Sequence, residues 1–270
     1  PPPPNIGCWV VHKTRGEPLP FTEPEMPPEP INVIYQTTED DADDTIVPRF
    51  IRANGDRERL LFISEKVAPI SFGDDRIEAA IRATGARLLI LDPLSSYIGD
   101  CQINAANEVR PRFNRLIQVA KDTGCAIVII NHLNKMVGTK AIYRTPGSID
   151  IVGAVRSALL IGRTKTCMEE RVMVQQKANL APTGQAIVFS VGEDGVQFLR
   201  ETEQTADQLL AGYGQPIGRP DVKTQEAMGP SMMEAITGGS HRMGLRTRLG
   251  TCSMEVPRPW ESRPFRPFSL

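Results

Sequence analysis

Short apolar strand patterns alternate with amphipathic helical patterns between Asn32 and Asn131, and this alternation restricts the fold more than any other feature. A strand that is followed by a helix and then by another strand makes a right-handed crossover, which places the two strands parallel. The sequence therefore predicts an α/β fold with a mostly parallel central sheet. The predicted elements are strands at 32–38, 59–64, 87–92 and 125–131, and helices at 43–53, 75–84 and 105–123.

The pattern changes after Gly147, where several short strand patterns follow one another with turns between them. Successive strands without long helices between them favour antiparallel pairing, so we expect them to extend the parallel sheet. The predicted elements here are a short helix at 148–155, strands at 156–163, 171–179, 185–191 and 195–200, and a helix at 205–210.

The two ends of the chain differ in composition from its middle. Prolines are concentrated in residues 1–30, so we expect a Pro-rich arm that is largely disordered. Residues 212–270 are rich in Gly, Pro and Arg without helical or strand periodicity, which predicts a disordered tail. We therefore expect residues 31–211 to form one folded domain.

Charge and cysteine content exclude several classes of protein. A formal net charge of -1 gives no global attraction to nucleic acid or membrane, so a charged binding surface has to be local. The five cysteines are scattered and include no CxxC pair, which argues against a disulfide framework or a zinc site. Apolar runs are too short to span a bilayer, and no signal-peptide pattern is present, so we expect a cytoplasmic protein without a membrane partner.

Polar residues follow three of the predicted strands at their carboxyl ends. Because the carboxyl ends of parallel strands share one edge of a sheet, where ligands collect, we expect these residues to converge. An acid, a magnesium ligand and a phosphate-sensing group together suit a nucleoside triphosphatase. Taken singly, Asp41 and Asp43 favour helix capping instead, and a lone histidine is more often structural. The polar residues are Glu39, Asp40 and Asp41, then Asp92, then Asn131 and His132.

Five blocks between Arg15 and Leu199 resemble one known family in order and spacing. They resemble the RecA-like AAA-family ATPases of the RepA-type hexameric replicative helicase group, which occur in phage and plasmid replication loci. The resemblance implies a RecA-like P-loop NTPase three-layer fold, ATP and Mg as cofactors, single-stranded DNA as a partner, and a ring-shaped, hexamer-like homo-oligomer. The blocks are YQTTEDDADDTIVPRF, LLILDPLSSYIGD, INHLNK, YRTPGSIDIVGAVRSALLIGR and QQKANLAPTG.

The resemblance also implies roles for individual residues. Glu39 matches the acid that polarises the attacking water. Asp92, at the end of the Walker B strand, matches the acid that holds magnesium through water. His132 matches the γ-phosphate sensor. Arg156 and Lys177 are both candidates for a basic finger that reaches into the neighbouring subunit's site, and each is also compatible with a solvated strand residue.

The family's phosphate-binding loop, GxxxxGK[ST], does not occur in these 270 residues. The family places it upstream of the segment that resembles TRGEPLPF, where residues 1–14 contain Gly7 as their only glycine. The short matches at 138–140 and 163–166 lack the glycine spacing that aims consecutive amides at phosphate oxygens. We therefore expect the first strand and the P-loop to be missing and catalysis to be impaired, in either a truncated chain or a degenerate homologue.

Three functions remain open at this point. The first is an ATPase domain of a replication helicase or helicase loader that acts on DNA, and the second is a non-catalytic assembly subunit of the same fold. The third is a nucleic-acid-binding module that uses residues 133–147 and the Arg-rich tail, because cations and an aromatic ring suit phosphates and base stacking. The candidate nucleic-acid-binding residues are Lys135, Lys140, Tyr143 and Arg144.

Overall fold

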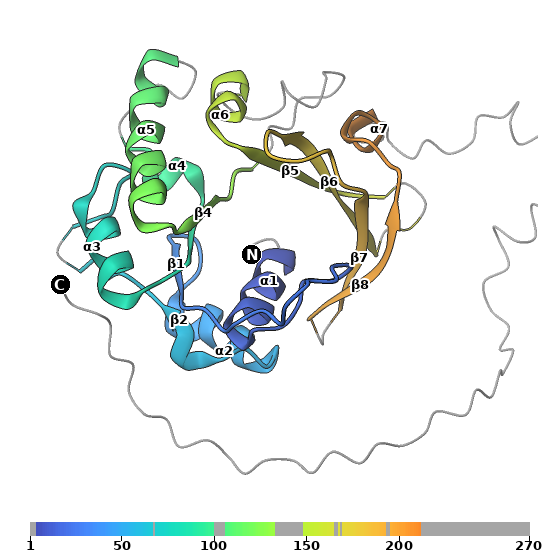
Figure 1. The fold of residues 1–270 in the computed structure, drawn as a ribbon, viewed down its shortest axis with the longest axis horizontal. Helices are drawn as coiled ribbons and strands as arrows, with labels where there is room; N and C mark the ends of the chain where they lie inside the picture. Colours follow the sequence, from blue (N-terminus) through green and yellow to red (C-terminus); the bar gives the residue numbers. More distant parts are fainter. Residues whose placement is uncertain are drawn as a thin grey trace, which may run out of the picture. The chain divides into compact units, whose positions relative to one another are not determined.

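The fold contains a parallel and an antiparallel sheet, each of four strands (Figure 1). It is known from a computed structural model. The residues that the structure describes are 4–66, 68–99, 106–132, 148–164, 167, 169–192 and 195–211.

The first sheet is entirely parallel, with the strand order β2-β1-β3-β4. The predicted α/β class with a parallel core is therefore confirmed. The paired part of β2 is much shorter than the segment 59–64 that the sequence predicts. The strands are β1 (Val33–Thr37), β2 (Leu60–Leu61), β3 (Leu88–Asp92) and β4 (Ala126–Ile129).

Helices cover both faces of this sheet, which gives three layers. Side chains on a strand alternate between faces. Tyr35 and Ile90 therefore pack with α1 and α2, whereas Ile34 and Leu89 pack with α3, α4 and α5. The helices are α1 (Pro4–Arg15), α2 (Val47–Arg52), α3 (Asp75–Thr84), α4 (Leu94–Tyr97) and α5 (Ala106–Thr123), with a π-helical turn η1 (Ala42–Ile46) and a 3₁₀ turn η2 (Arg57–Arg59).

Helix α1 contradicts the expectation of a disordered arm over residues 1–30. Proline is tolerated in the first turn of a helix, where an amide hydrogen has no partner within the helix. The rest of α1 contains no proline. Val10 and Val11 are buried against β1, so packing on the sheet stabilises the helix. Composition averaged over residues 1–30 hides the proline-free segment that forms most of α1, which is why disorder was expected there.

The second sheet is antiparallel, with the order β5-β6-β7-β8. Its strands were expected, but within the described residues no ladder joins β5 to β4. In the described part of the chain, β4 pairs with β3 alone. The elements are α6 (Ser148–Ala154), β5 (Ser157–Arg163), β6 (Glu170–Ala178), β7 (Ala186–Gly192), β8 (Gly195–Thr202) and α7 (Ala206–Ala211).

None of the described helices combines the length and apolar character that crossing a membrane would need. The predicted tail at 212–270 lies outside the described residues.

Candidate active site

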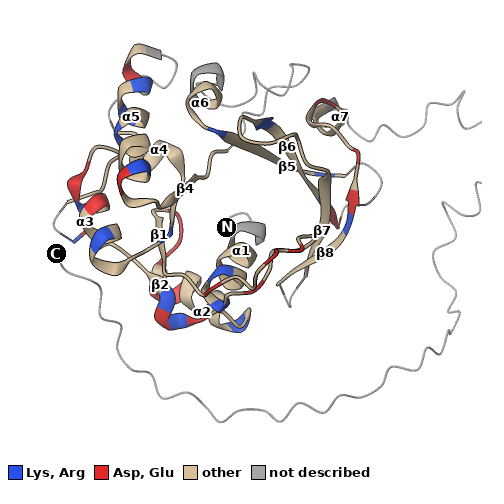
Figure 2. Ribbon diagram, viewed as in Figure 1, with Lys and Arg blue, Asp and Glu red and all other residues tan. Residues whose placement is uncertain are grey.

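An acidic segment follows β1 (Figure 2). Hydrogen bonds to β3 and within the segment hold it in place. The Thr38 amide donates to the Asp92 carbonyl over 3.2 Å, which continues the pairing of β1 with β3. The Asp41 carboxylate accepts from the amides of Asp43 and Asp44, over 2.8 and 2.9 Å, and so caps η1 as predicted for Asp41. Glu39 is left between the end of the strand and this cap, with its side chain exposed.

Glu39, Asp92 and His132 converge at the carboxyl edge of the parallel sheet. Oε1 of Glu39 lies 3.2 Å from Nε2 of His132. One ligand atom from each of the three side chains lies within 4.8 Å of the others. The strands β1, β3 and β4 are neighbours, so their ends bring together residues that are far apart in the sequence. The expected convergence is observed, whereas the role of each residue stays a prediction.

Asp92 is the buried member of this cluster, with 1% of its surface exposed. The Tyr35 hydroxyl donates to Oδ2 of Asp92 over 3.1 Å. Oδ1 is also buried and accepts no hydrogen bond from the described residues. Burial raises the pKa of the Asp92 carboxyl, and the charge of Glu39 raises it further, against lowering effects of Tyr35 and His132. A cation near Oδ1 would compensate this buried charge.

Tyr35 contacts the site directly, and its neighbour Gln36 ties β1 to the 63–65 segment. Burial and the neighbouring Asp92 raise the pKa of Tyr35, which keeps its hydroxyl protonated as a donor. Gln36 donates to Oε1 of Glu65 over 2.8 Å and accepts from the Ile63 amide over 2.6 Å. A hydroxyl and an amide in a strand as apolar as β1 are the sequence signal that could have identified them.

Arg156 and Lys177, the two finger candidates, lie in different environments. Lys177 donates from Nζ to the carbonyl oxygens of Val152, Gly153 and Val155, over 2.7, 3.1 and 2.8 Å. Lys177 thus caps the end of α6 within its own chain. The Arg156 side chain is exposed and makes no hydrogen bond or ion pair with the described residues. In the same part of the chain, no polar contact joins either residue to Glu39, Asp92 or His132.

The predicted nucleic-acid-binding residues Lys135, Lys140, Tyr143 and Arg144 all lie outside the described residues.

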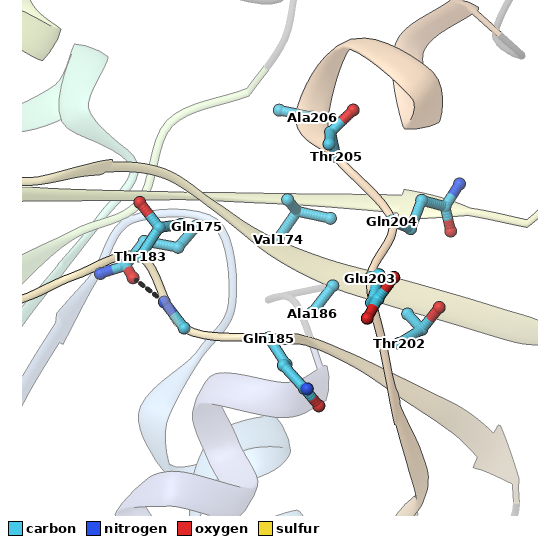
Figure 3. A pocket seen from close by; sticks show the side chains of 11 residues that line it. Val174, Gln175, Thr183, Gln185, Ala186, Thr202, Glu203, Gln204, Thr205 and Ala206 are labelled. Carbon is cyan, nitrogen blue, oxygen red and sulfur yellow. Dashed lines mark hydrogen bonds between the residues drawn. The ribbon is translucent and has the colours of Figure 1, made fainter.

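A shallow pocket lies on the antiparallel sheet and α7 (Figure 3). Gln175 accepts a hydrogen bond from the Gly184 amide at its wall, over 2.9 Å. Among the described residues that line it, Glu203 alone is charged. The pocket therefore offers no pair of groups for acid–base or metal chemistry, unlike the edge of the parallel sheet.

Comparison with known proteins supports the sequence resemblance at a coarse level. No curated protein sequence matches the chain significantly. A crystal structure of the RadB recombinase is similar at 13% identity and a TM-score of 0.44, over 63% of this chain and 80% of that chain, which is too loose to carry a functional argument. Residues 8–137 match the family model described as an AAA domain. This match spans all four parallel strands and the whole Glu39–Asp92–His132 cluster.

Proposed function

We propose that residues 31–211 are a RecA-like ATPase domain whose Glu39–Asp92–His132 cluster forms the hydrolytic end of a Mg·ATP site. The observation that carries this proposal is the convergence of two carboxylates and one imidazole at the ends of three neighbouring parallel strands. The AAA-domain match over residues 8–137 supports it, because it includes all three residues.

The chemistry of the three side chains suits phosphoryl transfer to water. Glu39 is an exposed carboxylate that can accept a proton from a water and orient it for in-line attack. His132 can donate a hydrogen bond to a terminal phosphate. Asp92 fits magnesium, because Oδ1 is buried without a partner among the described residues while Oδ2 is fixed by Tyr35. Magnesium, when bound, supplies charge neutralisation for the phosphates.

We further propose a role in cytoplasmic DNA replication, as a helicase or helicase loader that acts on single-stranded DNA in a ring-shaped homo-oligomer. The resemblance of the five sequence blocks supports this role. Arg156 is the better candidate for the finger that acts on a neighbouring subunit, since Lys177 is engaged by three carbonyl groups of its own chain.

ATP hydrolysis by these 270 residues is expected to be impaired. The sequence contains no GxxxxGK[ST] loop to hold the β- and γ-phosphates. Removal of a single such electrostatic interaction costs about 3 kcal/mol in a typical site. Glu39 and Asp92 then have no phosphate held in line to act on.

The test compares ATP hydrolysis by the purified chain and by its Glu39→Gln variant. We expect equal, background rates. The same pair is then measured in a form extended by the upstream coding sequence, if that sequence encodes a Gly-Lys-Ser or Gly-Lys-Thr loop. In the extended form, Glu39→Gln should lower the rate by about 10²- to 10⁴-fold.

A clear rate difference in the unextended chain would reveal a phosphate site of another kind and contradict the proposed impairment. An extended protein that hydrolyses ATP independently of Glu39 would refute the assigned role of this residue. An extended protein with no hydrolysis would favour the alternative of a non-catalytic assembly subunit.

A further inference from the structure

The Glu39–Asp92–His132 cluster has the composition of a transition-metal site. Imidazole nitrogen with two carboxylates suits Zn²⁺, Co²⁺, Mn²⁺ or Fe²⁺, whereas Mg²⁺ prefers oxygen ligands alone and keeps several waters. We propose that these three side chains bind one divalent transition-metal ion directly, without nucleotide. This proposal rests on the cluster's geometry and does not require the ATPase assignment to be correct.

The Glu39–His132 distance is that of two ligands that share one ion. Two ligand atoms about 2.1 Å from a metal lie about 3.0 Å apart at a right angle and about 3.4 Å apart at a tetrahedral angle. Nε2 of His132 and Oε1 of Glu39 are separated by 3.2 Å, between these values. All three ligand atoms lie within 4.8 Å of one another, so a small approach of the exposed Glu39 and His132 side chains would let the set share an ion.

The environment of Asp92 independently indicates that this residue binds a cation. Only 1% of its surface is exposed, yet Oδ1 has no hydrogen-bond partner among the described residues. A buried carboxylate oxygen without a donor is costly unless a cation completes it. The Tyr35 hydroxyl holds the other oxygen over 3.1 Å, as outer-shell donors hold the carboxylates of metal sites.

The local charge also favours a cation. In the described part of the chain, no Lys or Arg forms an ion pair with Glu39 or Asp92, so two carboxylates face one imidazole. Asp40 also lies near Tyr35, but its carboxylate pairs with Arg49 over 3.6 Å. A divalent ion would balance the two carboxylate charges and leave open positions for water.

The experiment titrates the purified, chelator-treated chain with Co²⁺ in the absence of nucleotide, followed by its visible d–d absorption and by calorimetry with Zn²⁺. We expect one ion per chain. His132→Ala and Glu39→Gln should each weaken binding by more than about 100-fold, since each removes a direct ligand. Tyr35→Phe should weaken it by about 10- to 100-fold, as removal of an outer-shell partner does.

His12→Ala is the matched control. His12 forms a similar pair, with Nδ1 lying 3.3 Å from Oε2 of Glu17, but no third ligand joins it among the described residues. Binding should be unchanged in this variant. Circular dichroism checks that each variant folds, and both replaced ligands are exposed, so their replacement leaves the core intact.

Three results would overturn the proposal. One is the absence of stoichiometric Co²⁺ and Zn²⁺ binding by the wild-type chain. Another is equal affinity in wild type and His132→Ala, with intense near-ultraviolet charge transfer that assigns the ion to cysteine thiolates. The last is displacement of the ion by Mg²⁺ at equal concentration, which would mark an all-oxygen magnesium site.

Discussion

At the scale of single residues, contacts between distant parts of the chain hold Asp92 and strand β1 in place. Tyr35 and Asp92 are 57 residues apart, and Gln36 reaches the 63–65 segment from β1. The sequence predicts Glu39, Asp92 and His132 because each follows an apolar strand. It could not predict these supporting contacts, because they depend on which strands are neighbours and on which face each side chain lies.

Gln36→Ala should destabilise the fold by about 1 to 3 kcal/mol. Gln36 is 3% exposed, and its replacement would leave the buried Ile63 amide and the Glu65 carboxylate without their partner. Urea unfolding measures the difference. Gln118→Ala is the control, because Gln118 bonds on the surface to Asp122, and it should change stability by less than about 0.5 kcal/mol. Equal effects of the two replacements would contradict a structural role for Gln36.

At the scale of elements, local signals set some boundaries well and others poorly. Helix α3 was predicted at its observed bounds, because Asp74 caps its start and Gly85, with φ at 65°, ends it. Helix α5 ends before Gly124 in the same way, with φ at 66°. Helix α1 was missed because the proline content of its surroundings outweighed its own pattern, and α4 is a single turn too short to show periodicity.

Asp74→Ala should lower the free energy of unfolding by about 1 kcal/mol at neutral pH through removal of the α3 cap. The Arg76 side chain holds the pKa of Asp74 below its ordinary value of 3.8, despite partial burial. The stabilisation is therefore present above pH 3.8 and disappears as the pH falls through the lowered folded-state pKa. Urea unfolding at several pH values measures it. The difference in unfolding free energy between wild type and variant should become smaller in acid. A difference that grows as the pH falls would contradict this prediction.

Lys177→Met should destabilise the chain by about 1 to 2 kcal/mol, because it removes a cation from three carbonyls at the end of α6. Arg156→Met, at an exposed side chain, should change stability by less than about 0.5 kcal/mol. Thermal unfolding of both variants compares them. If Arg156→Met is the more destabilising of the two, the contacts of Lys177 with its own chain do not decide which residue acts as the basic finger.

At the scale of the whole molecule, alternation alone predicts the α/β class and the parallel direction of the strands in the first sheet. The sequence could not predict that the antiparallel strands form a sheet of their own. A strand pattern shows that a segment is a strand, but it does not show which other strand it pairs with. The proposed DNA partner rests on residues 133–147 and on the family resemblance, so it needs a test of its own.

Replacing Lys135, Lys140 and Arg144 together by Ala should flatten the salt dependence of single-stranded DNA binding, by about 0.7 in the log–log slope for each phosphate that is no longer bound. Tyr143→Ala should weaken binding by about 1 to 3 kcal/mol without changing the slope, if a base stacks on its ring. Fluorescence anisotropy in a form that ends at Leu210 avoids the Arg-rich tail. Absence of salt-dependent binding in that form would leave these four residues without a role in DNA recognition.

We propose that Glu39, Asp92 and His132 form one cation-binding site at the carboxyl edge of the parallel sheet. Anomalous diffraction from crystals soaked in Mn²⁺ or Zn²⁺ tests it most directly, because it locates both the ion and the three side chains. We expect one strong anomalous peak within bonding distance of all three residues. A peak elsewhere, or any two of these side chains on opposite edges of the sheet, would contradict it.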